Sequence, residues 1–360
     1  MENPPVNALN NETIIVCFAY NNSLVLVFKK GVHNMIAPIL ALSPVIPYIV
    51  LVVAFFALIK GADMFVDGAA SMAKKLGISP TIIGLTIVAM GTSAPEAAVS
   101  ITAALDKSNG IALGNVVGSN IFNLLVVLGV CMLITTVPTT KEILKRDYPW
   151  NILATVAVIV FIIDGQITRL EGLILLVLFV TYIAYVVYKA IKNRETSDDD
   201  EIKDISWSKS ILFLLVGIVL IVLGGDFVVD SATTIARSWG VDDMLIGLTI
   251  VALGTSLPEL VTSIVAAKKG ECGMAIGNVV GSNMFNLLFI LGMTTTITPI
   301  LGIDLAAGIF VDSIVLLVFT VIMYLFSIHG TKLQKGKGAA SLVFYFAYLA
   351  YIILRAFGTI

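Results

Sequence analysis

Long apolar runs, separated by short polar segments, follow one another along the chain from residue 46 onwards. A helix needs about 20 mostly apolar residues to cross the hydrocarbon core of a bilayer. Lipid satisfies no backbone polar group, and barrel strands give a weaker, alternating pattern, so these runs predict helices. We therefore expect an all-α membrane protein with ten transmembrane helices. The predicted spans cover residues 46–63, 78–104, 111–137, 149–163, 170–191, 210–229, 244–267, 274–299, 305–327 and 339–357.

The composition agrees with this pattern. Of the 360 residues, 58% are hydrophobic and only 13% are charged, whereas soluble domains carry about 25% charged residues. A net charge of −2 excludes the strongly basic balance of a nucleic-acid-binding protein. The three cysteines are far apart, and both histidines lie outside the apolar runs, so a disulfide framework, a zinc site and most histidine chemistry are excluded.

Two segments lie outside the predicted spans. Residues 1–45 are interpreted as an N-terminal extension outside the core, with an eleventh span over its short apolar run as the alternative. Residues 192–209 are interpreted as a solvated linker, although its acidic cluster at 198–201 leaves open a regulatory ion site. Fifteen of the 22 Lys and Arg residues fall on the linker's side of the membrane. This bias predicts a cytoplasmic linker and both termini outside a cell membrane.

The two halves of the chain repeat one another at a constant offset of 163 residues. Residues 84–96 read GLTIVAMGTSAPE, and residues 247–259 read GLTIVALGTSLPE. Residues 114–125, GNVVGSNIFNLL, recur at 277–288 as GNVVGSNMFNLL. Composition bias alone does not produce two such runs in the same register.

The number of spans between the copies determines their orientation. Five spans separate them, and five is odd, so the second copy enters the membrane from the opposite side. We therefore predict two inverted five-helix repeats, at residues 46–191 and 210–360. Inverted repeats are typical of transporters with a site near the bilayer midplane, which favours alternating access over a pore.

Glu96 and Glu259 are duplicated carboxylates deep inside predicted spans. A charge at the bilayer centre costs at least about 2.5–3.5 kcal/mol, so such a carboxylate indicates a functional site. We expect the pair to converge on one site of charge −2 where the repeats meet. Metal cations or protons would have to balance this charge, because no Lys, Arg or His lies close by in the sequence.

Further oxygen donors accompany the two glutamates. Pro95 and Pro258 lack an N–H, which leaves carbonyl oxygens available one turn earlier. Carboxylate, hydroxyl, amide and carbonyl oxygens together form the ligand set of a hard cation such as calcium, and sodium uses the same kind of oxygens. The candidate side chains, at helical spacing, are Thr92, Ser93, Ser119 and Asn123 with their copies Thr255, Ser256, Ser282 and Asn286.

Small and acidic residues at other positions, most of them repeated, receive plainer interpretations. The motif glycines are expected to allow the close helix packing that brings the ligands together. The remaining acidic residues are expected near span ends, at the interface or attracting cations, rather than as ligands. The glycines are Gly114, Gly118, Gly277 and Gly281, and the acidic residues are Asp63, Asp67, Asp226, Asp230 and Asp312.

With GTSAPE, GTSLPE and the two GNVVGSN runs, residues 46–357 resemble the calcium/cation antiporter superfamily, specifically its prokaryotic-type sodium/calcium exchangers. The resemblance implies that spans 2, 3, 7 and 8 form the core, while spans 1 and 6 slide across it. It implies calcium and sodium as transported ions, no resident cofactor, and a monomer sufficient for transport. It also implies that the backbone carbonyls of Thr92 and Thr255 help to hold calcium and those of Ala89 and Ala252 help to hold sodium.

Several sequence features favour sodium/calcium exchange over other functions. In the potassium-dependent exchangers the position of Asn286 resembles an aspartate, so the amide here argues against potassium transport. Proton/calcium antiporters tend to lack the full hydroxyl and asparagine set, and they rank second. A channel does not suit two inverted copies, an intramembrane hydrolase lacks a histidine base in the core spans, and no nucleotide domain for an ATP-driven pump is recognisable.

Overall fold

The computed structural model of the chain is almost entirely helical in its described residues, as the sequence predicts. The N-terminal extension up to residue 38 and linker residues 193–204 lie outside the described part of the chain. The described residues are 39–40, 42–105, 108–192, 205–241, 250, 252–303, 308–329 and 332–356.

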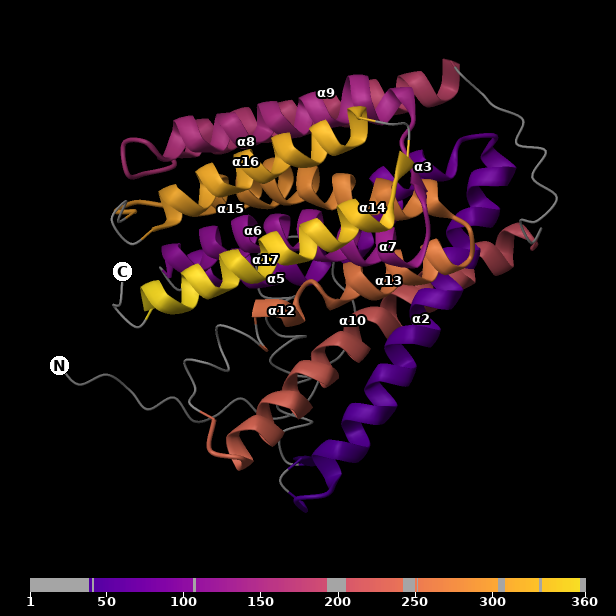
Figure 1. Cartoon of the computed structure of the whole chain (residues 1–360), viewed down its shortest axis with the longest axis vertical. Coiled ribbons are helices and arrows are strands. Elements are labelled where there is room, and N and C mark those ends of the chain that lie inside the picture. The colour runs from indigo at the N-terminus through magenta and orange to yellow at the C-terminus, as the bar shows by residue number, and fades with distance from the viewer. Residues whose placement is uncertain are drawn as a thin grey trace.

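Seven helices in the described part of the chain are long and apolar enough to cross a membrane (Figure 1). They are α2 (Ile46–Leu76), α6 to α7 (Asn109–Ile134), α9 (Arg169–Lys192), α10 (Trp207–Ser238), α14 to α15 (Cys272–Ile297), α16 (Ile309–Ile328) and α17 (Lys335–Ala356). An eighth span is broken, because its two parts, Pro80–Thr92 and Ala94–Leu105, meet at a bend of 47°.

Short helical and π-helical pieces make up the broken and bent spans. The first repeat contains α3 (Pro80–Ile83), η1 (Gly84–Val88), α4 (Ala89–Thr92), α5 (Ala94–Leu105), α6 (Asn109–Phe122), η2 (Asn123–Val127), α7 (Leu128–Ile134), η3 (Ile143–Asp147) and α8 (Tyr148–Ile162). The second contains α12 (Ala252–Gly254), α13 (Leu257–Lys268), α14 (Cys272–Met284), η5 (Phe285–Ile290) and α15 (Leu291–Ile297). Each of the ten predicted spans therefore coincides with a helical segment, although residues 244–249 and 251 of the seventh are not described.

Three predicted boundaries are wrong. The first span ends at Leu76 instead of residue 63, and the sixth ends at Ser238 instead of residue 229. The helix of the fourth span begins at Lys141 instead of residue 149, and it passes through the π turn η3 just before Pro149. Proline cannot donate the usual backbone hydrogen bond, and the π turn accommodates this interruption within a continuous helix.

Two short backbone contacts relate the ends of the repeats. Strand β1 (Val137–Pro138), after the third span, pairs antiparallel with β2 (Lys332–Leu333), before the tenth. Ile167, before the fifth span, forms a bridge with Ile300, after the eighth. Residue 300 follows residue 137 by the repeat offset of 163. The two halves are thus joined by two corresponding contacts, as expected for two repeats related by a pseudo-twofold axis.

The helices form a compact core with one tilted pair beside it. Helices α2 and α10 pack along one another and cross the remaining helices obliquely, projecting to the lower part of the view (Figure 1). In the core, α13 and α5 pack against the helix that follows each of them, α14 and α6. Large apolar side chains such as Val177, Val180 and Phe346 are more than 60% exposed, as expected for surfaces that face lipid.

Glycine allows backbones to approach closely at the predicted interfaces. A Cβ at Gly61 of α2 would lie 2.9 Å from the Gly217 carbonyl oxygen of α10. A Cβ at Gly281 of α14 would lie 2.6 Å from the Leu85 carbonyl oxygen. Gly277 and Gly281 therefore serve close packing, as predicted. For the copies Gly114 and Gly118, the positions that correspond to Leu85 and its neighbours, 244–248, lie outside the described residues.

We expect Gly281→Ala to lower the free energy of unfolding by about 1–3 kcal/mol, because the new methyl group meets backbone that cannot move freely. Thermal unfolding of the detergent-solubilised protein measures this effect. Gly336→Ala in α17 is the matched control, since a Cβ there meets no described atom within 4 Å. Equal melting temperatures for the two variants would contradict the close contact.

Candidate functional site

The backbone breaks at the same point of the repeated motif in both halves. Ser93 has φ −84° and ψ 10°, and Ser256 has φ −92° and ψ 5°, values outside the helical region. A new helix then begins, with a proline in its first turn, where the missing N–H costs least. As a result, Glu96 lies in the first turn of α5 and Glu259 in the first turn of α13. The helix dipole favours negative charge at this position.

The two glutamates meet through hydrogen bonds that cross between the repeats. The Ser93 hydroxyl donates to Glu259 Oε1 at 2.8 Å, and the Ser256 hydroxyl donates to Glu96 Oε1 at 3.1 Å. All four side chains are fully buried. The structure thus brings together the two carboxylates that the sequence predicts to converge, and each is bound by the broken helix of the opposite half.

Two asparagines orient the threonines of the motif. The Thr92 hydroxyl donates to Asn278 Oδ1 at 3.1 Å, and the Thr255 hydroxyl donates to Asn115 Oδ1 at 3.4 Å. The amide nitrogen of each asparagine donates in turn to a serine on the preceding helix. These asparagines were not predicted as site residues, although each follows the first glycine of a duplicated GNVVGSN run, which is the signal that identifies them.

The other predicted asparagines lie where the helix widens into a π turn. Asn123 begins η2, and Asn286 is the second residue of η5. Such π turns occur frequently at functional sites. Asn286 donates to Asn120 Oδ1 at 3.0 Å. Asn120 and Asn283 donate to one another's backbone carbonyls, both at 3.3 Å, so this layer also crosses the repeat interface.

Several buried oxygen atoms near this centre have no hydrogen-bond partner among the described residues. They include Asn123 Oδ1, Asn286 Oδ1, Ser282 Oγ and Glu259 Oε2, and each of these side chains is fully buried. Buried polar atoms in proteins nearly always find a partner, in the protein or in a bound ion or water. Oxygens of this kind are suited to coordinate a hard cation.

The structure describes the remaining candidate ligands in less detail. Hydroxyl groups of Thr92 and Ser282 lie beside the Glu259 carboxylate, and Ser119 is buried on α6. The Ala89 carbonyl accepts the Ser93 N–H at 3.0 Å and the Thr92 hydroxyl at 3.4 Å. Ala252 begins α12, but its side chain is not described. The described residues contain no group of three or more His, Cys, Asp or Glu that could hold a metal.

Protein cations bind acidic residues away from this centre. Lys269, at the end of α13, contacts Asp63 Oδ1 and Asp67 Oδ1 on α2, each at 2.5 Å. Both aspartates lie within α2, because this helix continues past the predicted end of the first span at residue 63. Their ion pairs with lysine agree with the expectation that they attract cations, and their position relative to the membrane stays a prediction. Arg355 forms a bidentate ion pair with Asp312: Nη1 donates to Oδ1 at 3.1 Å and Nη2 donates to Oδ2 at 2.8 Å. Asp63, Asp67 and Asp312 thus each form an ion pair with a lysine or an arginine of the protein.

Broken helices from two inverted repeats, meeting at a buried and oxygen-rich acidic centre, define a secondary active ion transporter. The sodium/calcium exchanger protein family matches the chain at residues 46–188 and 209–354, one match in each half. The chain therefore belongs to the sodium/calcium exchanger family: it is a multi-pass membrane transporter and not an enzyme.

Individual relatives agree with this assignment. The Escherichia coli inner membrane protein YrbG is 34% identical over 258 residues, covering 69% of this chain and 79% of that protein. The Methanosarcina acetivorans sodium/calcium exchanger MaX1 is 31% identical over 341 residues, covering 84% and 97%. A structure of the sodium–calcium exchanger NCX_Mj has a TM-score of 0.75 at 30% identity and covers 84% of this chain and 98% of that one. Further NCX_Mj structures come from soaks with sodium and calcium or with sodium and strontium.

We expect calcium to raise the melting temperature of the purified protein and Glu259→Gln to abolish most of this increase. A ligand at 100 times its dissociation constant stabilises the folded state by about 2.7 kcal/mol, and the variant removes one of two carboxylates that would hold it. Thermal unfolding in detergent with and without calcium measures the effect.

Asp312→Asn is the matched control, because it also neutralises a buried carboxylate, but one that is paired with Arg355. This variant is expected to melt at a lower temperature and to keep the increase with calcium. An undiminished calcium effect in Glu259→Gln would contradict the assignment of the site.

Proposed function

We propose that this protein exchanges calcium for sodium across a cell membrane by alternating access. The crossed hydrogen bonds of Ser93 and Ser256 with Glu259 and Glu96 are the observation that carries the proposal. They place two carboxylates at one buried point of the repeat interface, and this is where inverted-repeat transporters bind their substrates. The names of MaX1 and NCX_Mj as sodium/calcium exchangers support the same choice of ions.

The charge of the site explains why the two ions would compete. One calcium ion balances the two carboxylates, whereas at least two sodium ions are needed for the same effect. Calcium and sodium both prefer oxygen ligands, so they would use overlapping donors. The proposed ligands are Glu96, Glu259, Ser93, Ser256, Ser119, Ser282, Asn123 and Asn286, with backbone carbonyls of Thr92 and Thr255 for calcium and of Ala89 and Ala252 for sodium.

Coupling of the two fluxes follows from the cost of burying charge. When the barrier moves past an empty site, two bare carboxylates would be enclosed away from water, which is strongly unfavourable. Occupation by calcium or by sodium removes this cost. The transporter therefore changes between its inward-open and outward-open states only when ions are bound. This requirement couples the two fluxes and prevents uncoupled ion movement.

The tilted pair of helices is suited to move in this cycle. Helices α2 and α10 pack most extensively against one another. Helix α10 also reaches the cation site, since a Cβ at Gly225 would lie 3.6 Å from the ring of Pro258. We propose that the pair slides across the core as one unit. In the proposed orientation the linker and the Lys269 contact with α2 are cytoplasmic, both termini are outside, and a monomer is sufficient.

We expect sodium-loaded proteoliposomes to take up radioactive calcium when external sodium is replaced by choline, with pH clamped and a protonophore present. The sodium gradient supplies the driving force, and the amide of Asn286 argues against a need for potassium. Uptake in choline should therefore equal uptake in potassium. Glu96→Gln should reduce the rate of calcium uptake by at least about a hundredfold, because the single remaining carboxylate cannot neutralise the charge of a divalent ion.

Asp312→Asn again serves as the matched control and is expected to retain sodium-driven uptake. Calcium uptake that does not depend on the sodium gradient but is driven by an imposed pH gradient would instead indicate proton/calcium antiport. It would contradict the proposed sodium ligands. Uptake that requires potassium would assign potassium-dependent exchange.

A further inference from the structure

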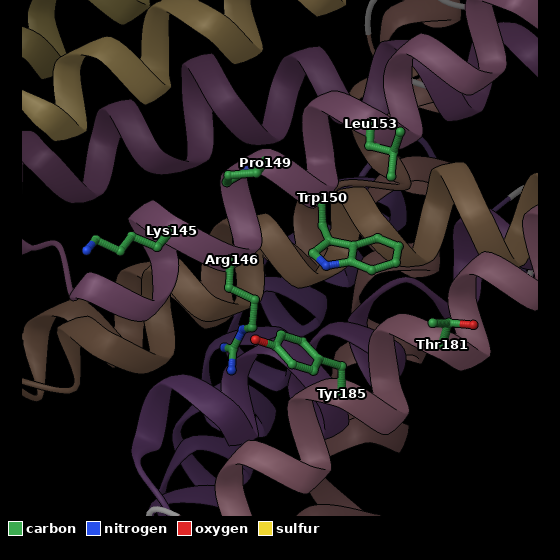
Figure 2. A pocket seen from close by; sticks show the side chains of 7 residues that line it. All are labelled: Lys145, Arg146, Pro149, Trp150, Leu153, Thr181 and Tyr185. Atoms are coloured by element: carbon green, nitrogen blue, oxygen red, sulfur yellow. The ribbon is translucent and has the colours of Figure 1, made fainter.

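A groove opens between the start of α8 and the later half of α9, on the side of the membrane that carries the linker (Figure 2). Its volume is about 370 Å³. Helix α8 packs chiefly against α16, and α9 packs chiefly against α15, so the two helices leave a gap between them at this end. The lining residues are Lys145, Arg146, Pro149, Trp150, Leu153, Thr181 and Tyr185.

A buried polar network fixes the inner wall of the groove. Arg146 donates from Nε and Nη2 to Asp147 at 2.6 and 3.0 Å, and the Tyr182 hydroxyl donates to Asp147 at 3.1 Å. The Trp150 ring packs against Tyr182, with centroids 5.7 Å apart. Arg146 is only 7% exposed, so its guanidinium is held in place instead of moving freely in water. Figure 2 shows it beside the Tyr185 hydroxyl, at the end of the groove near Lys145.

The groove carries an excess of positive charge. Three cations lie on its wall or rim: Lys145, Arg146 and Lys189, whose ammonium group is 5.7 Å from the centroid of the Tyr185 ring. Two nearby carboxylates partly offset this positive charge, the buried Asp147 and the exposed Glu142. The net charge of this group is +1, which favours a ligand with negative charge.

The groove continues into a surface that suits hydrocarbon. Leu153 is 48% exposed, and beyond it the outward faces of α8 and α9 present Val156, Val160, Val177 and Val180. Trp150 and Tyr185 lie at the boundary between the charged and the apolar part. Aromatic rings are enriched at this level of a membrane, and basic pockets between spans on the cytoplasmic side bind acidic headgroups.

We propose that this groove binds one phospholipid of net charge −1, with its phosphodiester beside Lys145 and Arg146 and its acyl chains along the valine-lined faces of α8 and α9. The site is separate from the cation site between the repeats. The proposed orientation assigns it to the cytoplasmic leaflet. A zwitterionic phospholipid would bring an additional cation to a wall that is already positive and would bind less well.

Quenching of Trp150 by brominated lipids tests the proposal. The variant carrying Trp207→Phe and Trp239→Phe leaves Trp150 as the single tryptophan, and both replaced residues are exposed and outside the groove. The full-length protein is reconstituted in phosphatidylcholine vesicles with either brominated phosphatidylglycerol or brominated phosphatidylcholine. We expect phosphatidylglycerol to bind about five times better, the contribution of roughly one basic residue near a membrane surface.

Lys145→Gln should reduce this preference to near unity, and Thr181→Phe, which fills the groove, should also abolish it. Lys335→Gln is the matched control, because Lys335 is exposed on the same side but lies outside the groove. Soluble glycerol phosphate should not reverse the quenching, since the acyl chains contribute to binding. Equal quenching by both lipids, an unchanged preference in Lys145→Gln, or displacement by glycerol phosphate would overturn the proposal.

Discussion

The burial of two carboxylates at the contact between the repeats is the constraint around which this structure is arranged. Each glutamate accepts a hydrogen bond from a serine of the opposite repeat, at 2.8 and 3.1 Å. The serines reach across because the helices break at Ser93 and Ser256, and the following prolines tolerate that break. Glycines such as Gly281 then allow the surrounding helices to approach closely enough to exclude water from the pair.

The sequence was sufficient to predict most of this arrangement because the relevant information is local and duplicated. Each of the ten apolar runs coincides with helical structure, and the odd number of spans between the repeated motifs predicted the inversion. Within a motif, helical spacing placed Thr92 and Ser93 near Glu96. The duplicated glutamates, costly at this depth, then indicated that the two motifs meet.

Features that depend on distant contacts were missed. Helix α2 continues to Leu76 because its small residues, including Gly68, pack against α10, which the hydropathy of residues 64–76 does not reveal. Asn115 and Asn278 orient the threonines of the opposite repeat, a role that only the crossed geometry discloses. The ion pair between Asp312 and Arg355 was also not predicted, because Arg355 follows 43 residues later in another helix.

The contact between Lys269 and α2 has a further consequence for a molecule whose centre is nearly twofold. Lys269 bridges the end of α13 to Asp63 and Asp67, while the residue 163 positions earlier in the sequence is Asp106. The sequences of the two repeats therefore differ in charge at this position, because an aspartate stands in the first repeat where the second has a lysine. If α2 slides across the core as proposed, the distance from Lys269 to Asp63 and Asp67 would change, so this ion pair would favour the state in which it is formed.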